Sequence, residues 1–431
     1  MARFLRSYSI VRWTAARAAL GLCLAVALGC GVKTQSPDAP GPRTSSPAQI
    51  EAATPALEAI RAAEFGRAGA LAEAVLDADA HNAYAAAARA MARFQHSMHH
   101  LGQETIAVLD LTDKRGFDHA RMRAALEQTV TAYIAIDADL AVAAGDAAFE
   151  FELCMACWER DWNHSGEIDE GDRRLLQIEI DADGNPIPKG DPRRTPTFRF
   201  DLGDLYWARA MVSFQRAALE LILAYQWTEI DKLLTMTMSG SMPVITIHLD
   251  DPARIATARE LILAGVDHAA RSREAYLAET DDDREWVPNP RQQNHPLPLP
   301  VDEALYEVWA GVLGDVGRLV AGEEALSVSE LAQLGDHQWD NPPRGYIHIG
   351  KMLAEPKDIV FDLPALAREA QTANGDDTAM VERVLASVLG EYYLMEMTPS
   401  PLVARLARMK REMDRGEDTL ERKLRYLLWL N

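Results

Sequence analysis

The chain has 431 residues and a formal net charge of −21 at pH 7, from 44 Lys and Arg residues against 65 Asp and Glu residues. This acidic balance argues against nucleic acid as a partner, because DNA and RNA are bound through a basic surface. A hydrophobic fraction of 48% excludes a chain that is disordered throughout. Four cysteines are too few for a disulfide-dense scaffold, and the length predicts two or three structural units.

Residues 1–29 have the pattern of an export signal. Four arginines and no acid precede or flank an apolar stretch, 18–28, which is too short to span a bilayer. Removal of this segment would bring the net charge to −25. The stretch is followed by Gly29 and Cys30, a pair that resembles the lipobox of bacterial lipoproteins, although Ala27 and Leu28 depart from the family's usual residues.

The lipobox resemblance implies that Cys30 is lipidated and becomes the first residue of the mature protein, which is then anchored to a membrane. Gly31 after the cysteine implies sorting to the outer membrane. An ordinary secretory signal with an incidental cysteine is the alternative. Residues 30–48 contain four prolines and no aromatic residue, so we expect a disordered tether between the lipid and the folded body.

The mature chain is predicted to be mainly α, a multi-helix body with small β insertions. The region 49–145 is alanine-rich with helical periodicity, and 55–88 resembles one tetratricopeptide repeat, with Gly66 at the turn and Ala68 and Ala72 at the helix contact. A single copy predicts a helical hairpin and not an array. Generic alanine-rich helices are the alternative.

Further helices and short strands are expected along the rest of the chain. The polar, proline-rich segment 279–300 is expected to be a loop, and 335–362 is expected to be irregular. The expected helices span 115–145, 146–177, 202–225, 251–276, 301–321, 363–373, 378–395 and 400–429. The expected strands span 178–180, 198–200 and 243–249.

Residues 161–172 read Asp-Trp-Asn-His-Ser-Gly-Glu-Ile-Asp-Glu-Gly-Asp, which resembles the 12-residue calcium loop of EF-hand proteins. Gly166 stands at the sharp turn, where a side chain would clash. The resemblance implies an EF-hand-like helix-loop-helix over 146–180 that binds Ca²⁺. It also implies that Ile168 packs inward. The implied ligands are Asp161, Asn163, Ser165, Glu167, Asp169 and Asp172.

Several features predict a weak, structural calcium site. Asp172 closes the loop where the family has the longer Glu, which places the dissociation constant on the order of 10⁻⁴ to 10⁻³ M. The segment 181–191 has Pro186 where a second loop would need glycine, so it is expected to be a turn. Of the four positions before the loop that are apolar in the family, three are apolar here and the fourth is Arg160.

Two other clusters carry weaker signals. Cys154 and Cys157 are expected to be buried thiols or a local disulfide, because a redox pair normally lies at a helix N-terminus. His96, His99 and His100 share one helix face and could bind a metal, although surface histidines are the commoner case. His337 and His348 lie in the irregular segment. The sequence contains no glycine-rich phosphate loop, nucleophile elbow or recognisable catalytic triad.

These observations favour a calcium-binding, lipid-anchored protein of the cell envelope that acts as a binding or scaffold module. Its acidic surface predicts a protein partner with a basic patch. The alternatives are a periplasmic metal-dependent enzyme and a solute-binding protein, with a site in the 279–350 loops or at the three helical histidines. Convergence of three of these groups, the five histidines and any acids that join them, within a few ångströms at the floor of a pocket would favour the metalloenzyme.

Overall fold

The computed structural model describes residues 43–413, apart from gaps at 110–116, 163–164, 234–235, 237–241, 299–300, 334–342, 373–380 and four short gaps between 383 and 395. The predicted signal at 1–29, Cys30, most of the predicted tether and His337 therefore lie outside the described residues. So does much of the helix expected at 378–395, and so does every residue after 413.

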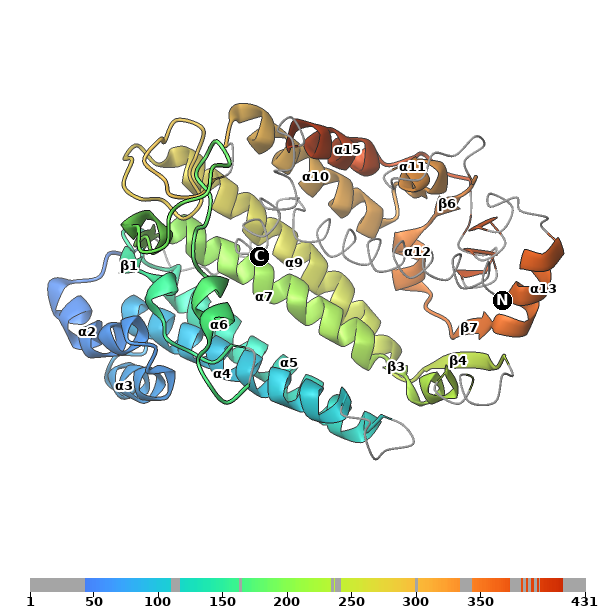
Figure 1. The fold of residues 1–431 in the computed structure, drawn as a ribbon, viewed down its shortest axis with the longest axis horizontal. Helices are drawn as coiled ribbons and strands as arrows, with labels where there is room; N and C mark the ends of the chain where they lie inside the picture. Colours follow the sequence, from blue (N-terminus) through green and yellow to red (C-terminus); the bar gives the residue numbers. More distant parts are fainter. Residues whose placement is uncertain are drawn as a thin grey trace. The chain divides into compact units, whose positions relative to one another are not determined.

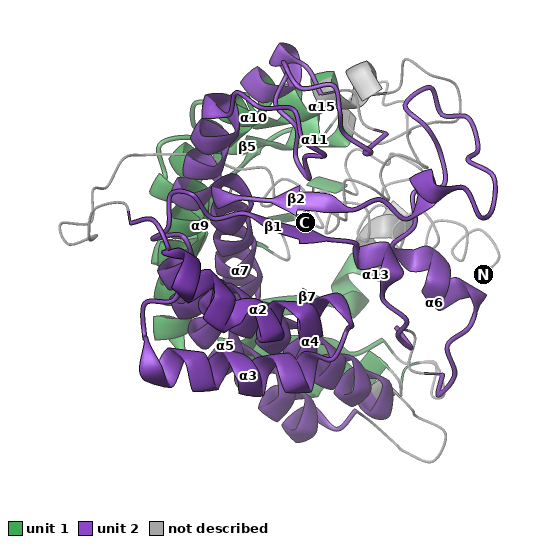
Figure 2. Ribbon diagram, turned by 90° about the vertical axis from the view of Figure 1, so that its left-hand side faces the viewer, with its two compact units in different colours: residues 1–32, 220–266, 308–411 green, residues 33–219, 267–307, 412–431 purple. Residues whose placement is uncertain are grey.

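The described chain is mainly helical, with a few short strands, as the sequence predicts (Figure 1). It divides into two compact units (Figure 2). The described part of one, here called the helical unit, comprises 43–219, 267–307 and 412–413; the other, the mixed unit, comprises the described residues of 220–266 and 308–411. No helix of the described chain is both long enough and apolar enough to cross a membrane.

The helical unit begins with four helices: α2 (Pro47–Arg61), α3 (Phe65–Ala78), α4 (Ala83–Leu109) and α5 (His119–Ala143). Helix α4 packs on the other three. Ala68 and Ala72 of α3 are fully buried, so the expected close helical hairpin is present. Gly66 lies inside α3 and not at the turn; the turn instead contains Ala63, whose φ is +56°.

The predicted tether ends earlier than expected. The backbone of Arg43 donates to Gly145 O at 3.0 Å and accepts from Ala147 N at 2.9 Å, so the chain is fixed from this residue on. Helix α2 then begins at Pro47, inside the range predicted to be disordered. The reason is a capping box, in which Ser46 and Gln49 each bond the other's backbone N–H, followed by a proline at the first helical position.

The helix expected at 146–177 is wrong. This segment forms strand β1 (Phe151–Leu153), a 3₁₀ turn η1 (Met155–Cys157) and the short helix α6 (Glu170–Leu175). Strand β1 alternates buried, exposed and buried residues and pairs antiparallel with β2 (Phe198–Phe200). This alternation fits a strand with one buried face. The expected strand at 178–180 instead contributes Ile180 to an isolated bridge with Pro186, which closes the expected turn.

The segment 279–300 is a loop, as expected, but it is packed into the helical unit. Asn289 is fully buried and donates through its side chain to Tyr276 O at 2.8 Å. Trp286 and Leu297 enter a small apolar core. That core joins the loop to β2 and to the segment after α6; its buried members are Ile178, Ile180, Ile187, Phe198, Trp286 and Leu297.

Three long helices, α7 (Leu202–Leu223), α9 (Pro252–Ala278) and α10 (Glu303–Ala321), contain the unit boundaries. The mixed unit has an antiparallel sheet of β3 (Tyr225–Gln226), β4 (Val244–Leu249) and β7 (Ile359–Asp362), and a β5 (Leu326–Ser327) and β6 (Tyr346–Ile347) pair. Its other elements are η3 (Thr228–Asp231), α11 (Val328–Gln333), α12 (Ile349–Ala354), α13 (Leu363–Thr372) and α15 (Leu402–Met413). The 3₁₀ turn η2 (Pro192–Arg194) belongs to the helical unit.

Candidate functional site

The first half of the predicted calcium loop closes on Asp161. Its carboxylate accepts from the backbone N–H of Ser165 at 3.0 Å and of Gly166 at 2.7 Å. Gly166 has φ +92°, which confirms the sharp turn that the sequence predicts at this position. Ser165 Oγ donates to Glu167 O at 2.9 Å. The carboxylate oxygens of Asp161 keep further lone pairs, so these bonds leave it able to bind a cation as well.

The second half of the loop closes on Asp172. Asp169 and Asp172 form a capping box at the start of α6, with side-chain to backbone distances of 3.0 and 2.9 Å. Asp172 is buried and also accepts from Trp162 N at 2.8 Å. Asn163 lies outside the described residues. Ile168 is 38% exposed, so the expectation that it packs inward is wrong. In EF-hand proteins this residue packs against a partner loop, and the segment 181–191, which lacks the required glycine, does not offer one.

The chain that enters the loop is held against the helices of its unit. Trp158 is buried, donates through Nε1 to Ile60 O at 2.9 Å and packs edge-on against Phe65. Arg160 donates to Gln95 Oε1 at 2.8 Å. A disulfide joins Cys154 to Cys157, one of the two states expected for this pair. Helices α2, α3 and α4 thus support the loop in place of an entering helix.

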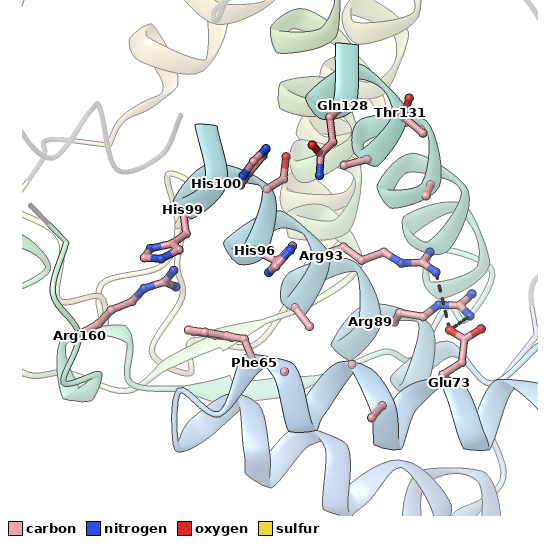
Figure 3. A pocket seen from close by; sticks show the side chains of 17 residues that line it. Phe65, Glu73, Arg89, Arg93, His96, His99, His100, Gln128, Thr131 and Arg160 are labelled. Atoms are coloured by element: carbon pink, nitrogen blue, oxygen red, sulfur yellow. Dashed lines mark hydrogen bonds and ion pairs between the residues drawn. The ribbon is translucent and has the colours of Figure 1, made fainter. Parts of the chain in front are cut away.

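The three helical histidines do converge on a pocket. His96, His99 and His100 line a cavity of about 600 Å³ between α3, α4, α5 and Arg160 (Figure 3). The other charged groups in its wall are Glu73 and two more arginines, Arg89 and Arg93. Among the described residues, no three ligand atoms that include these histidines come within 4.8 Å of one another, so the described histidines do not converge as a metal site requires. His348 lies in the mixed unit, where its Nδ1 caps α12 by accepting from Lys351 N at 3.1 Å.

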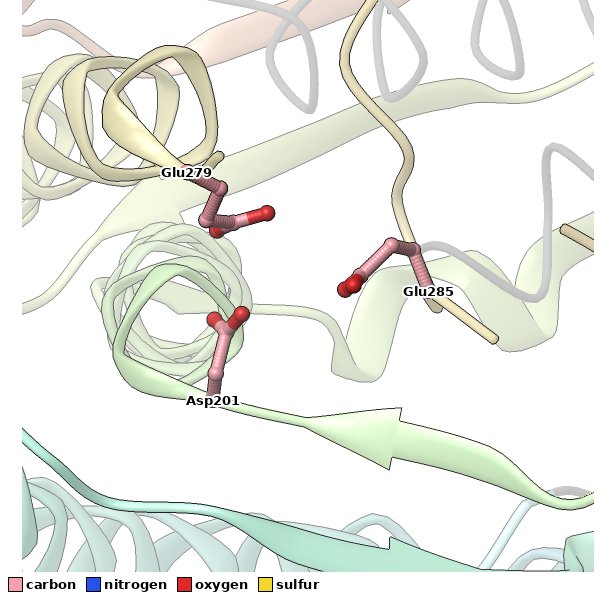
Figure 4. Close-up of side chains that lie close together, drawn as sticks. All are labelled: Asp201, Glu279 and Glu285. Atoms are coloured by element: carbon pink, nitrogen blue, oxygen red, sulfur yellow. The ribbon is translucent and has the colours of Figure 1, made fainter. Parts of the chain in front are cut away.

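A buried acidic cluster that the sequence did not predict also lies in the helical unit. Among the described residues, three ligand side chains of the His, Cys, Asp or Glu type come within 4.8 Å of one another at one place, Asp201, Glu279 and Glu285. Figure 4 shows the three carboxyl groups pointing toward one another. Asp201 precedes α7, Glu279 follows α9, and Glu285 lies in the packed loop.

A fourth carboxyl group, from Asp204 in the first turn of α7, lies beside this cluster. Its Oδ1 accepts from the Tyr276 hydroxyl at 2.7 Å and its Oδ2 from Asp201 N at 2.9 Å. The cation nearest Glu285 is Arg199 at 3.6 Å, and Arg199 also binds Glu150 and Asp281. Negative charge in the cluster is therefore only partly balanced.

Carboxyl groups of the cluster therefore bind protons more tightly than exposed carboxyl groups do. Burial and the charge of Asp201 raise the pKa of Glu279 from 4.5 to about 10 and that of Glu285 to about 7. The same two causes raise the pKa of Asp204 well above its ordinary value. The carboxyl groups of Asp201 and Glu279 are hydrogen-bonded to each other, which requires a proton between them. Chemically, the cluster can hold either protons or a divalent cation.

Similar proteins do not assign a family to this chain. Comparisons with protein-family models, with curated proteins and with solved structures find no match.

Proposed function

We propose that the chain is a lipid-anchored binding protein of the cell envelope in which a calcium loop staples the segment 151–180 onto the helices α2, α3 and α4. The observation that carries this proposal is the closed turn at Asp161, whose carboxylate gathers two backbone N–H groups around a glycine with positive φ. That turn is the backbone arrangement that the resemblance to a calcium loop requires.

A staple suits the way this loop is supported. Its entry strand has three residues and its exit helix six, so neither element has much stability of its own. A cation bound by Asp161, Asn163, Ser165, Glu167, Asp169 and Asp172 would hold the two ends together. Millimolar calcium against a dissociation constant tenfold lower would contribute roughly 1.4 kcal/mol to the native state.

The place in the cell follows from the N-terminal sequence. Lipidation of Cys30 would anchor the protein to a membrane, with Gly31 favouring the outer membrane. The Cys154–Cys157 disulfide supports an oxidising compartment outside the cytosol. The acidic surface supports a protein partner that presents a basic patch.

Calorimetry of the mature chain tests the calcium site. We expect one weak calcium site and a rise in melting temperature with calcium, both lost in Asp161→Ala. Glu170→Ala is the matched control, because Glu170 lies inside the loop at position ten, which does not ligate, and its ion pair with Lys189 is exposed. Absence of both heat and a melting shift at several millimolar calcium would contradict the proposal.

Metabolic labelling with a fatty acid tests the anchor separately. The wild-type protein should take up the label and Cys30→Ser should not. Equal labelling of the two would show that the lipid, if any, is attached elsewhere, and would leave the calcium result unaffected.

A further inference from the structure

The charged groups that line the cavity between α3, α4 and α5 are mainly positive, although the protein as a whole carries −21. Three arginines and three histidines face it, and Glu73 is the acid in its described lining. With neutral histidines the lining carries a formal charge of +2. A concave site with one sign of charge concentrates ligands of the opposite sign.

Two of the arginines are already neutralised. Arg89 binds Asp139 at 2.6 Å and Glu73 at 2.6 Å, and Arg93 binds Asp139 at 2.7 Å. Asp139 is 3% exposed and lies behind the cavity wall. At the other end, Glu104 lies near His100 but is paired with Arg121. These acids and bases form balanced sets that fix the shape of the wall.

Arg160 is different because its guanidinium has no carboxylate within 4.0 Å in the described part of the chain. Its polar partners are the side chain and the carbonyl of Gln95, at 2.8 and 3.3 Å. Its charge lies over the rings of Phe65 and Trp162, at 5.2 and 5.1 Å from the ring centres. Burial lowers the pKa of Arg160, but an arginine still keeps its proton. A half-buried cation without a counter-ion is costly unless an anion joins it.

Most of the remaining lining is apolar or small. Phe65, Gly66, Gly69 and several alanines form much of the wall, and a Cβ built on Gly66 would meet nothing within 4 Å. A volume of about 600 Å³ is the size of a site for a small organic ligand. An apolar wall that includes the Phe65 ring, beside one arginine without a carboxylate partner in the described chain, suits a ligand with an aromatic body and one oxyanion.

We propose that this cavity binds a small organic oxyanion, a carboxylate or a phosphate ester on an aromatic body, with Arg160 as the residue that binds the oxyanion and Phe65 as the wall for the ring. The histidines supply further N–H donors around the same space. The proposal rests on the lining of this cavity and not on calcium binding or on the lipid anchor.

Titration of the full mature chain with benzoate, phenyl phosphate and benzamide tests the proposal. Benzamide has the shape of benzoate without its charge. We expect benzoate or phenyl phosphate to bind with a dissociation constant on the order of 1 mM, as suits a ligand of about ten heavy atoms, and benzamide to bind at least tenfold more weakly. The stronger of the two anions identifies the oxyanion.

Variants locate the site. Arg160→Gln should weaken the anion at least tenfold, whereas Arg67→Gln removes the same charge from the exposed face of α3 and should leave affinity unchanged. Gly66→Trp should block the cavity from a position where the backbone accepts a side chain, and its melting temperature should stay at or above that of the wild type. This second variant covers the case in which Arg160→Gln unfolds.

Three results would overturn the proposal. The first is that neither anion binds at 20 mM. The second is that benzamide binds as tightly as benzoate. The third is that a folded Gly66→Trp protein retains wild-type affinity for the anion.

Discussion

Replacing Glu279 by glutamine should change how the stability of the protein depends on pH. The folded chain keeps a proton on this carboxyl up to about pH 10, whereas the unfolded chain releases it near 4.5. Between these values the folded state binds more protons than the unfolded state, so the free energy of unfolding falls as the pH rises. The stabilising effect of the retained proton is complete below pH 4.5 and is lost progressively as the pH rises from 4.5 to about 10.

The magnitude follows from the size of that shift. Each pH unit between the two pKa values costs about 1.36 kcal/mol, so the interval from pH 5 to pH 8 has an upper limit of about 4 kcal/mol. Asp201 and Glu279 share their proton, and the Glu279 side chain is partly exposed. We therefore expect about half of the limit, roughly 2 kcal/mol.

Glutamine keeps the shape and the hydrogen bonds of the neutral acid. Its amide N–H can donate to Asp201, and its oxygen can accept from Gln292 Nε2, which lies 3.2 Å from Glu279 Oε2. Glu279→Gln should therefore match the wild type at pH 5 and be more stable by roughly 2 kcal/mol at pH 8. Urea denaturation in EDTA, followed by tryptophan fluorescence, measures this difference. Glu274→Gln, on the exposed face of the same helix, is the control.

A loss of stability that is the same at every pH would refute the reasoning, because it would show that Glu279 is ionised in the folded protein. The same experiment with magnesium or calcium in place of EDTA asks whether the cluster holds a cation. A cation there would stabilise the wild type at pH 8 and reverse the sign of the effect of the glutamine.

Three further predictions concern the packing at Gly203, the buried acid Asp139 and the calcium loop. Gly203→Ala should cost roughly 1–3 kcal/mol in thermal unfolding, because a Cβ there overlaps the buried ring of Tyr276; an unchanged melting temperature would contradict this packing. Asp139→Ala should lower the free energy of unfolding, measured by urea denaturation, by about 3 kcal/mol, since it leaves two arginines of α4 without their shared buried acid. A loss below about 1 kcal/mol would contradict this role of Asp139. Chelation of calcium should weaken benzoate binding several-fold in the wild type and not in Asp161→Ala, because Arg160 directly precedes the loop. An equal effect on the two proteins would show that the calcium loop does not influence the cavity.

The long helices were predictable because their signals are local. Helices α7 and α9 begin and end within two residues of the predicted bounds, since each has an apolar face and an aspartate before its first turn. The segment after α5 was not predictable in this way. Phe151 and Leu153 form a strand only because Phe198 and Phe200, almost fifty residues later, supply the partner. A helix was the natural prediction without that partner.

The site residues also differ in whether their sequence signal is local or depends on residues far apart in the chain. The turn at Gly166 was evident from spacing alone, because a calcium loop is a local pattern. The acidic cluster draws Asp201 and Glu279 from two helix ends that are 78 residues apart, so no spacing rule could join them. Arg160 did leave a signal: it is the one residue before the loop that departs from the apolar pattern, and departures from a local rule often mark a residue with another task.

The backbone bonds of Arg43 to Gly145 and Ala147 set a limit on how far the protein can reach. With the lipid on Cys30, as proposed, 12 residues lie between the lipidated residue and this fixed point, so the chain has 13 residue-to-residue steps to span. Even fully extended, such a segment spans about 45 Å. The protein would therefore search a shallow layer next to the bilayer, and a partner anchored in the same membrane would meet it at a high effective concentration. Insertion of residues between Cys30 and Arg43 would deepen that layer without touching the folded body.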